Sequence, residues 1–335
     1  MKSLLLPPLS TLYGAVTKTR LSLYRRGTFH TTRLERPVIS IGNITAGGTG
    51  KTPLVEWVAR TIANHGKNVC ILTRGYGREQ PQRQVVVSDG QTILATPAEA
   101  GDEPYLLATK LLGSAAIICN ADRISAGRDA IEVFGSDCFV LDDGFQHLRL
   151  ARDLNIVTID ATNPWGGGQL LPYGRLREPI SGLSRADCVV LTRADQVTNT
   201  TDLCDQIRAF IRGRPLFLST MRPARAPITN EPVAAFCAVG NPQSFFADLK
   251  KAGYEVLLEK TFADHHWYTQ RDIDELTAAA TAAGAQSLIT TAKDAVKLRS
   301  LSISLPYHVF EIEIAIEDEE TFRNLILKAA KANDD

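Results

Sequence analysis

Short runs of apolar residues alternate along the chain with longer stretches in which apolar residues recur every three or four positions. The runs VISI at 38–41, VCILT at 69–73 and CVVLT at 188–192 lack a strict apolar–polar alternation, which is typical of parallel strands covered on both faces. The longer stretches, such as 52–65 and 201–211, have the spacing of amphipathic helices. The pattern predicts an α/β fold built on a doubly wound, mostly parallel sheet.

The same pattern divides the chain into three parts. The predicted strands are 38–41, 69–73, 115–119, 138–141, 155–159, 188–192, 215–219, 233–239, 255–262, 287–291 and 307–314, and the predicted helices are 52–65, 97–112, 123–134, 201–211, 242–251, 271–283 and 317–331. The Pro-rich, polar stretch at 221–232 indicates a linker. We therefore expect an N-terminal segment (1–35), a larger core domain (36–221) and a smaller α/β domain (232–335). Asp89-Gly90 between apolar runs predicts a β-hairpin insertion near 84–94.

The N-terminal segment is basic, although the whole chain has no net charge. Residues 1–36 hold seven Lys/Arg and one acidic residue, so the rest of the chain is net acidic. Between 10 and 26, Leu12, Val16 and Leu21 are interspersed with Lys and Arg, which favours an amphipathic helix lying on a membrane surface. A terminal helix docked on its own domain is the alternative. The apolar stretch is too short to span a bilayer, and two prolines interrupt its start.

Composition excludes other classes of protein. The six cysteines form no C-x-x-C pair and no zinc-ligand spacing, and most lie in apolar runs, so we expect buried thiols in a reducing cytosol. Because the basic residues gather only at the N-terminal end, a nucleic-acid binder is not expected. No obligate protein partner is evident from the sequence.

A glycine-rich loop follows the first predicted strand. Residues 45–52 read TAGGTGKT, which matches the phosphate-binding pattern G-x-x-x-x-G-K-[ST] except that Thr45 replaces its first glycine. The strand before the loop, and the helix with Pro53 in its first turn after it, favour a nucleotide site over a structural glycine turn. Lys51 would reach the β- and γ-phosphates, and Thr52 would bind Mg²⁺. The nucleotide-binding candidates are Thr45, Ala46, Gly47, Gly48, Thr49, Gly50, Lys51 and Thr52.

Two acidic residues follow another predicted strand. The sequence CFVLDDGFQH places Asp142 and Asp143 directly after an apolar run. Enzymes with a phosphate-binding loop of this kind hold Mg²⁺ with a carboxylate at the end of a neighbouring strand. Both residues are therefore predicted metal ligands, with ion pairing at a strand end as the alternative.

Seven motifs together carry a specific resemblance. They are GNITAGGTGKTP, RGYG (74–77), GDEP (101–104), LDDGFQH (141–147), LLPYGRLREP (170–179), FADHH (262–266) and TAKDAVKL (291–298). In this order, over nearly the whole chain, they resemble the tetraacyldisaccharide 4′-kinase family, in which Thr45 is also a family trait. The resemblance implies ATP-dependent transfer of a phosphate to the 4′-hydroxyl of an acylated glucosamine disaccharide 1-phosphate, yielding lipid IVA in lipid A biosynthesis. It also implies a peripheral enzyme on the cytoplasmic face of the Gram-negative inner membrane.

Site roles follow from the motifs and from strand ends. Asp102 of GDEP is the candidate catalytic base, and the resemblance suggests the same, whereas the alternative is an acidic first turn of a helix. His265 is its expected partner, although the adjacent His266 is also possible. Together with Lys51 these are the predicted catalytic residues. Lys293 and Asp294 are expected to help hold the nucleotide.

Further candidates line the predicted carboxyl edge of the sheet, where parallel strands end together. Glu178 is a predicted Mg²⁺ ligand, with a loop ion pair as the alternative. The predicted substrate contacts are Arg74, Tyr76, Arg123, His147 and Arg177.

A second function class competes with the kinase. VVLTRAD at 189–195 resembles the element that reads guanine in GTPases, with Asp195 as acceptor but with Arg193 in place of its lysine. A P-loop GTPase acting as a switch or metal-insertion chaperone is therefore the alternative.

Overall fold

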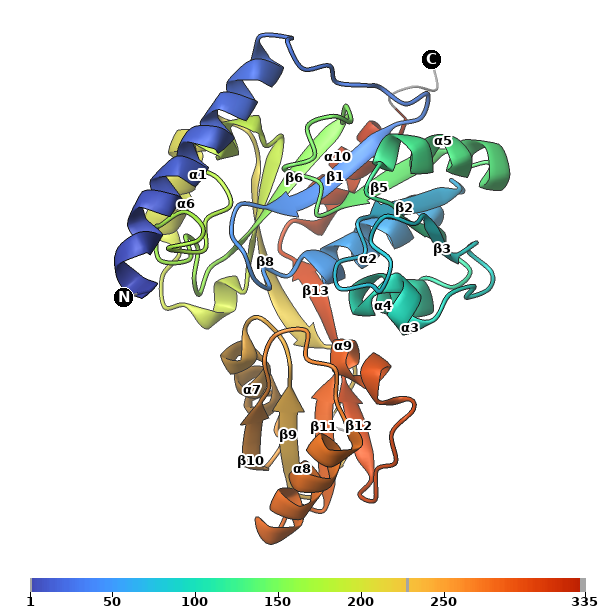
Figure 1. The fold of residues 1–335 in the computed structure, drawn as a ribbon, viewed down its shortest axis with the longest axis vertical. Helices are drawn as coiled ribbons and strands as arrows, with labels where there is room; N and C mark the ends of the chain where they lie inside the picture. Colours follow the sequence, from blue (N-terminus) through green and yellow to red (C-terminus); the bar gives the residue numbers. More distant parts are fainter. Residues whose placement is uncertain (1, 227–228, 332–335) are drawn as a thin grey trace.

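The computed structural model describes residues 2–226 and 229–331. Residue 1 of the predicted N-terminal segment, residues 227–228 of the predicted linker and residues 332–335 of the predicted C-terminal domain lie outside the described residues. Figure 1 shows a large lobe and a smaller lobe, with the N-terminal helix α1 (Lys2–Arg25) along one side of the large lobe.

The large lobe is built on a nine-stranded sheet in the order β13-β8-β7-β6-β1-β5-β2-β4-β3. The strands are β1 (Val38–Asn43), β2 (Val69–Thr73), β3 (Val85–Ser88), β4 (Ala115–Cys119), β5 (Cys138–Asp142), β6 (Leu154–Asp160), β7 (Cys188–Thr192), β8 (Leu216–Pro223) and β13 (Ile312–Ile316). All neighbouring strands run parallel except the two edges, where β3 and β13 are antiparallel. The predicted doubly wound, mostly parallel sheet is confirmed.

Helices cover both faces of this sheet. They are α2 (Lys51–Ala63), α3 (Pro97–Ala100), α4 (Asp102–Lys110), α5 (Arg123–Phe134), α6 (Thr201–Ile211) and α10 (Glu319–Ala330), with the 3₁₀ helices η1 (Ile180–Arg185) and η2 (Ala194–Gln196). Ile39 and Ile41 of β1 pack with α2, α4 and α10 in one buried cluster, whereas Phe139 and Leu141 of β5 pack with α5 on the other face. Because successive strand residues point to opposite faces, unbroken apolar runs suit this double cover.

The small lobe holds a second, four-stranded parallel sheet in the order β10-β9-β11-β12. Its elements are β9 (Val233–Cys237), α7 (Pro242–Lys251), β10 (Val256–Thr261), α8 (Gln270–Ala282), β11 (Ser287–Thr291), α9 (Ala292–Ala295), the 3₁₀ helix η3 (Val296–Leu298) and β12 (Tyr307–Phe310). The chain enters this lobe through β8 and leaves it through β13, two strands that pair antiparallel between the lobes (Figure 1).

Three elements differ from the sequence expectation. The predicted strand 307–314 is split into β12 and β13, and β13 and α10 return to the large sheet, although the sequence assigned all of 232–335 to the second domain. The reason is packing: Phe322 of α10 is fully buried against Trp57 and Phe217. Segment 84–94 does turn back at Asp89-Gly90, but its strand β3 extends the edge of the large sheet. The predicted helix 97–112 is broken at Gly101 into α3 and α4.

Candidate active site

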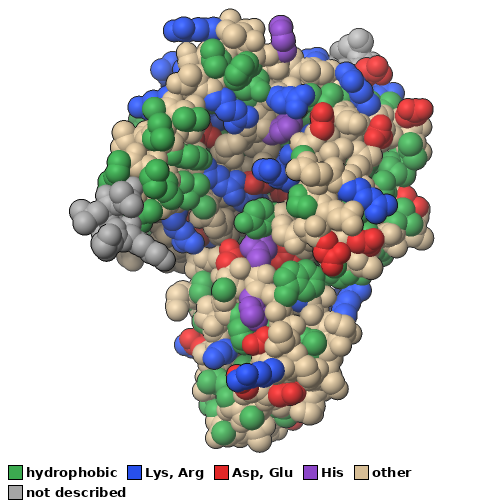
Figure 2. Space-filling model, in the orientation of Figure 1, with side chains coloured by type: hydrophobic (Ala, Val, Ile, Leu, Met, Phe, Trp, Pro, Cys, Tyr) green, Lys and Arg blue, Asp and Glu red, His purple; other side chains and the backbone are tan. Residues whose placement is uncertain are grey.

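A cavity of about 990 Å³ lies between the two lobes, at the carboxyl edge of the large sheet. Its walls come from the glycine-rich loop, from the ends of β2 and β5, from the start of α4 and from loops of the small lobe. Figure 2 shows Lys, Arg, Asp, Glu and His side chains gathered where the two lobes meet. Of the predicted site residues, those that line the cavity are Ala46, Gly47, Gly48, Thr49, Gly50, Lys51, Thr52, Arg74, Tyr76, Arg123, Asp142, Asp143, His147, Arg177 and His265, with Lys293.

The glycine-rich loop has the backbone that a phosphate cradle requires. Gly47 and Gly50 have φ values of 121° and 76°, a region that glycine enters without a steric penalty. The loop leads into the N-terminus of α2 at Lys51, where unpaired N–H groups and the helix dipole favour an anion. The loop is held to the end of β1, because Asn43 donates a hydrogen bond of 3.0 Å to the Thr49 hydroxyl.

Thr45 occupies the first glycine position of the loop without strain. Thr45 is buried, and its φ angle is not positive. Its backbone forms an antiparallel bridge with Leu176. The next residue, Ala46, donates its N–H to the carbonyl of Arg175 at 2.6 Å. The first position is therefore extended and does not need glycine. Thr45 itself does not line the cavity, so its contribution is to the shape of the loop.

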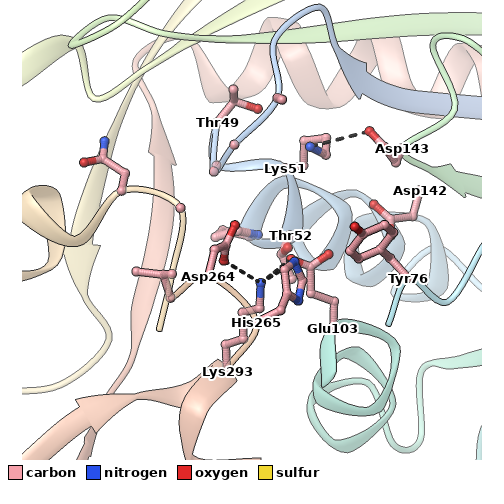
Figure 3. Close-up of a pocket in the computed structure, with 18 of the residues that line it drawn as sticks. Thr49, Lys51, Thr52, Tyr76, Glu103, Asp142, Asp143, Asp264, His265 and Lys293 are labelled. Atoms are coloured by element: carbon pink, nitrogen blue, oxygen red, sulfur yellow. Dashed lines mark hydrogen bonds and ion pairs between the residues drawn. The ribbon is translucent and has the colours of Figure 1, made fainter. Parts of the chain in front are cut away.

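Lys51 and Arg177 both contact Asp143. The Lys51 ammonium lies 3.5 Å from Asp143 (Figure 3). Arg177 donates two hydrogen bonds to the same carboxylate, at 2.8 and 2.6 Å. Burial alone would raise the pKa of Asp143, but Lys51 and Arg177 outweigh burial and hold this pKa at about 2. The carboxylate therefore stays charged and orients two cations at the edge of the cavity.

Asp142 has a different environment from its neighbour. It ends β5, and Thr73 at the end of β2 donates a hydrogen bond of 3.0 Å to it. Burial raises the pKa of Asp142 to about 6, and the nearby acids Glu103 and Asp143 add to this effect. A desolvated carboxylate beside two other acids is stabilised by a bound cation. The residues present thus fit a magnesium ion, which commonly takes one or two carboxylates together with phosphate oxygens and water.

Asp102 and His265 meet across the junction of the two lobes. Asp102 is the first residue of α4, after Gly101 with φ 88°, and only 4% of it is exposed. His265 Nδ1 lies 3.1 Å from Asp102 Oδ2. On the other side of the ring, Lys293 donates to His265 Nε2 at 3.3 Å (Figure 3). His265 lines the cavity and Asp102 does not, so Asp102 lies behind the imidazole ring.

The two partners influence each other's protonation. Burial would raise the pKa of Asp102, but the hydrogen bond from His265 and the charges of Lys293 and Lys297 lower it to about 2. In turn, the hydrogen bond to Asp102 raises the pKa of His265 above its usual value. The adjacent His266 points elsewhere, because it pairs with Asp272 at 3.1 Å and stacks on Phe262. The geometry therefore favours His265 as the partner of Asp102.

The predicted substrate contacts are spread over the rim of the same cavity. Tyr76 is 72% exposed, and its ring lies 5.3 Å from the ring of His265. Arg123 is buried at the start of α5. Burial, with Arg123 as the next cause, lowers the pKa of His147 to about 4, so this imidazole is neutral at pH 7. Arg74 completes the group on the side of β2.

Glu178 and Asp294 are not among the described residues that line the cavity. Glu178 is 1% exposed, and Arg185 pairs with its two oxygens at 3.0 and 2.7 Å, so the sequence alternative of a loop ion pair describes its position. Asp294 is fully buried and accepts a hydrogen bond from the N–H of Ala238 at 3.0 Å. The carbonyl of Ala238 in turn accepts from the N–H of His265 at 3.2 Å, so Asp294 supports the His265 loop.

Sequence reasoning missed several residues that the structure places at the site. Glu103 accepts a hydrogen bond of 2.9 Å from Lys293, which is a further contact between the two lobes. Gln146 donates to the carbonyl of Asn43 at 2.8 Å, just before the glycine-rich loop. Each adjoins a predicted residue, Asp102 and His147, within the quoted motifs GDEP and LDDGFQH. The motifs therefore contained these residues, but the spacing gave no reason to choose them.

The segment that resembles a guanine reader makes structural contacts. Arg193 pairs with Asp160 at 2.6 Å and donates to the carbonyl of Gly48 at 3.1 Å, so it supports the glycine-rich loop from behind. Asp195 forms an ion pair with Lys251 of α7. These contacts occupy the two residues on which the GTPase alternative depends.

Helix α1 is docked on the large lobe and still presents an apolar face. Ser10 donates to the carbonyl of Leu170 at 2.9 Å, and Tyr13 donates to the carbonyl of Arg177 at 2.8 Å. The neighbouring face of the helix leaves Leu12 61% and Val16 59% exposed. The helix therefore combines the docked alternative with an exposed surface beside the cavity.

Comparisons with known proteins agree with the geometry. A family model described as tetraacyldisaccharide-1-P 4′-kinase matches residues 2–331. The tetraacyldisaccharide 4′-kinase of Geobacter metallireducens is 44% identical over 299 residues, covering 88% of this chain and 88% of the relative. The kinase of the same name from Geobacter sulfurreducens is 43% identical over 312 residues, covering 91% and 87%.

A solved structure extends the similarity to three dimensions. The chain superimposes on LpxK from Aquifex aeolicus, solved in complex with ATP, with a TM-score of 0.77 at 32% identity, covering 96% of this chain and 97% of that one. The family model and these relatives favour the kinase over the GTPase alternative. As the seven motifs predicted, the chain belongs to the tetraacyldisaccharide-1-P 4′-kinase family.

Proposed function

We propose that the cavity between the lobes transfers the γ-phosphate of ATP to the 4′-hydroxyl of a tetraacylated glucosamine disaccharide 1-phosphate. The O–P bond to ADP breaks, a new O–P bond forms to the sugar, and the hydroxyl proton leaves to a protein base. The products are ADP and the 1,4′-bisphosphate, lipid IVA. The observation that carries this assignment is the Asp102–His265 pair at the cavity that holds the glycine-rich loop.

The phosphate-binding half of the reaction rests on the loop between β1 and α2. The N–H groups from Gly47 to Thr52 would bind phosphate oxygens, and Lys51 would neutralise the charge that builds up during transfer. Lys51 is held near the cavity by Asp143 at 3.5 Å. Asp143 therefore orients this lysine, and Arg177 beside it adds a second cation.

Asp142 and Thr52 are the residues that would hold Mg²⁺. Magnesium bound here would supply charge neutralisation on the phosphates of ATP. Asp142 is suited to this role because its carboxylate is desolvated. Among the contacts of the described residues, it accepts a hydrogen bond from Thr73 and forms no ion pair. Asp143, by contrast, is already paired with two cations, and Glu178 with Arg185.

The Asp102–His265 pair would remove the proton of the attacking hydroxyl. A base is required close to that hydroxyl, and a carboxylate hydrogen-bonded to an imidazole can hold and share the proton. His265 faces the cavity and Asp102 lies behind it. His265 has φ 61°, an uncommon conformation for a residue other than glycine, and such conformations gather at functional sites.

The acceptor is expected at the rim formed by Arg74, Arg123 and Arg177. Guanidinium groups bind phosphate with paired, charge-assisted hydrogen bonds, which suits the 1-phosphate of the sugar lipid. Neutral His147 and exposed Tyr76 offer hydrogen bonding and ring stacking to the sugar. The side of the cavity beside Tyr13 of α1 leads toward the exposed face of that helix.

Helix α1 would hold the enzyme at the cytoplasmic face of the inner membrane, where the lipid substrate lies. Among the residues that the structure describes, no helix is both long and apolar enough to cross a bilayer. An interfacial helix needs an apolar face and basic residues near anionic headgroups. Leu12 and Val16 supply the first, and the basic residues of 18–36 supply the second.

Phosphate transfer is the direct test of this function. With purified protein, Mg²⁺, ATP and detergent-dispersed tetraacyldisaccharide 1-phosphate, mass spectrometry of the lipid should show the gain of one phosphate. GTP in place of ATP forms the parallel arm and should support much less transfer. If the folded protein hydrolyses GTP and the lipid gains no phosphate in either arm, the result would contradict the kinase assignment. It would favour the alternative of a P-loop GTPase that acts as a switch.

Asp102→Asn should lower kcat by about 10²-fold or more, because positioned acid–base catalysis contributes about this much. The affinity for ATP should be unchanged, since the glycine-rich loop is left intact. Steady-state kinetics and a binding titration measure the two effects. Asp205→Asn, an exposed change on α6, is the matched control and should behave like the wild type. Wild-type turnover in Asp102→Asn would remove Asp102 as the base.

Replacing both Leu12 and Val16 with serine should weaken binding to vesicles containing phosphatidylglycerol by about tenfold or more, because each apolar side chain loses its favourable transfer into lipid. The docked face of α1 is untouched, so the cavity should keep its shape. Val133→Ser, which changes a similarly exposed apolar residue on α5, is the control. Equal vesicle partition of the double variant and the wild type at low salt would show that α1 serves only the fold.

A further inference from the structure

Lys297 is a buried lysine with no role in the phosphate transfer proposed above. It lies in η3 of the small lobe, and its side chain is fully inaccessible to solvent. Lysine is almost never fully buried unless it is paired, because a desolvated ammonium is costly. The anions around Lys297 therefore show what this charge does.

Two carboxylates from different lobes surround the Lys297 ammonium. It donates a hydrogen bond of 3.2 Å to Asp294, three residues earlier in the same segment. It also lies 3.4 Å from Oδ2 of Asp102, the oxygen that faces His265. The ring of Tyr268 lies 5.9 Å away. The charge thus reaches across the junction from the small lobe to the proposed base on α4.

We propose that Lys297 is a positioning residue for phosphate transfer, whose buried ammonium keeps the Asp102 carboxylate ionised and directed at His265. This inference rests on the proposed role of Asp102. Because the two residues belong to different lobes, the contact exists only while the small lobe is docked on α4. Docking of the lobes and the charge state of Asp102 are thereby linked.

Lys297 differs from the other cation that faces Asp102. Lys293 lies 3.9 Å from Asp102, but it is closer to Glu103, at 2.9 Å, and it also lies 3.9 Å from Asp264. Its side chain lines the cavity and is 15% exposed, so solvent reaches it. Lys297 is sealed from solvent, so its attraction for Asp102 is weakly screened by water and salt.

The protonation of Asp102 therefore depends on every charge that packs against it. Lys297 and Lys293 come from the α9–η3 segment, His265 comes from its own loop, and Glu103 neighbours Asp102 on α4. Burial would raise the pKa of Asp102, and these cations with the hydrogen bond from His265 lower it. Removing Lys297 takes away a nearby positive charge, so the pKa of the carboxylate must rise. The proton affinity of the coupled Asp102–His265 pair rises with it, so activity that needs this pair free to accept a proton is lost at a higher pH than before.

The test compares Asp294→Asn with Asp294→Asn/Lys297→Met. Both proteins lack the Asp294 charge, so they differ only in the lysine, and the double variant leaves no unpaired Asp294 carboxylate in the interior. Replacing both members of a buried pair together is often neutral for stability. The quantity measured is kcat as a function of pH.

The acid limb of kcat, which reports the coupled Asp102–His265 pair, should move up by about 1 pH unit or more in the double variant, the usual effect of losing a close opposite charge. The deficit in kcat should grow as the pH falls. Lys250→Met removes an exposed lysine of the same lobe that pairs with Glu259 and should leave the limb in place.

Coincident acid limbs in Asp294→Asn and in the double variant would overturn the proposal and leave Lys297 a role in packing alone. That result is distinct from failure of the proposed function, which would show itself as wild-type turnover in Asp102→Asn. A shifted limb together with an inactive Asp102→Asn supports both.

Discussion

The contact between Asp102 and His265 is the interaction on which the site depends, because it joins the two lobes beside the cavity. Asp102 is fixed by its place at the start of α4, whereas His265 is fixed by the small lobe through the carbonyl of Ala238. Neither lobe alone holds the pair. The antiparallel strands β8 and β13 and the ion pair between Glu103 and Lys293 set how the lobes meet, and so they also set the geometry of the pair.

The part of the site that belongs to the large lobe could be predicted from the order of strands in the sequence. Parallel strands end at one edge of a sheet, so residues that directly follow apolar runs are brought together whatever their separation in the chain. This is why the glycine-rich loop, Asp142, Asp143, Arg74 and Arg123 could all be placed on one cavity from the sequence. The strand pattern also predicted the doubly wound sheet, since both of its faces are covered by helices.

Other features depend on tertiary contacts that no local pattern encodes. Sequence spacing cannot show that Phe322 packs beside Trp57, and so the return of β13 and α10 to the large sheet was missed. Glu178 has a ligand's chemistry, but Arg185 occupies it in the fold. Lys297 looks like any surface lysine in the sequence, and only burial against Asp102 makes it significant. Helix α1 was predicted as amphipathic, but the sequence could not show that its Ser10 and Tyr13 hydroxyls donate docking hydrogen bonds to carbonyl groups far along the chain.

The local environment explains why the neighbouring acids Asp142 and Asp143, at the carboxyl end of β5, can have different tasks. Asp143 is held ionised by Lys51 and Arg177 and orients cations, whereas Asp142 is desolvated and fits a metal ion. Asp102 is 4% exposed, and burial would raise its pKa, but the hydrogen bond from His265 and the cations of the small lobe keep it ionised. All three residues are aspartates, so their different pKa values come from their environments.

The central claim is that Asp102 and His265 act as one unit across the junction, and a double-mutant cycle on kcat tests it most directly. Asp102→Asn, His265→Gln and the double variant are compared with the wild type at saturating ATP and lipid. Groups that act as a unit show strongly non-additive effects. The account predicts that the double variant is about as slow as the slower single variant. Losses that multiply, so that the double variant equals the product of the two single effects, would show that the residues act independently and would contradict it.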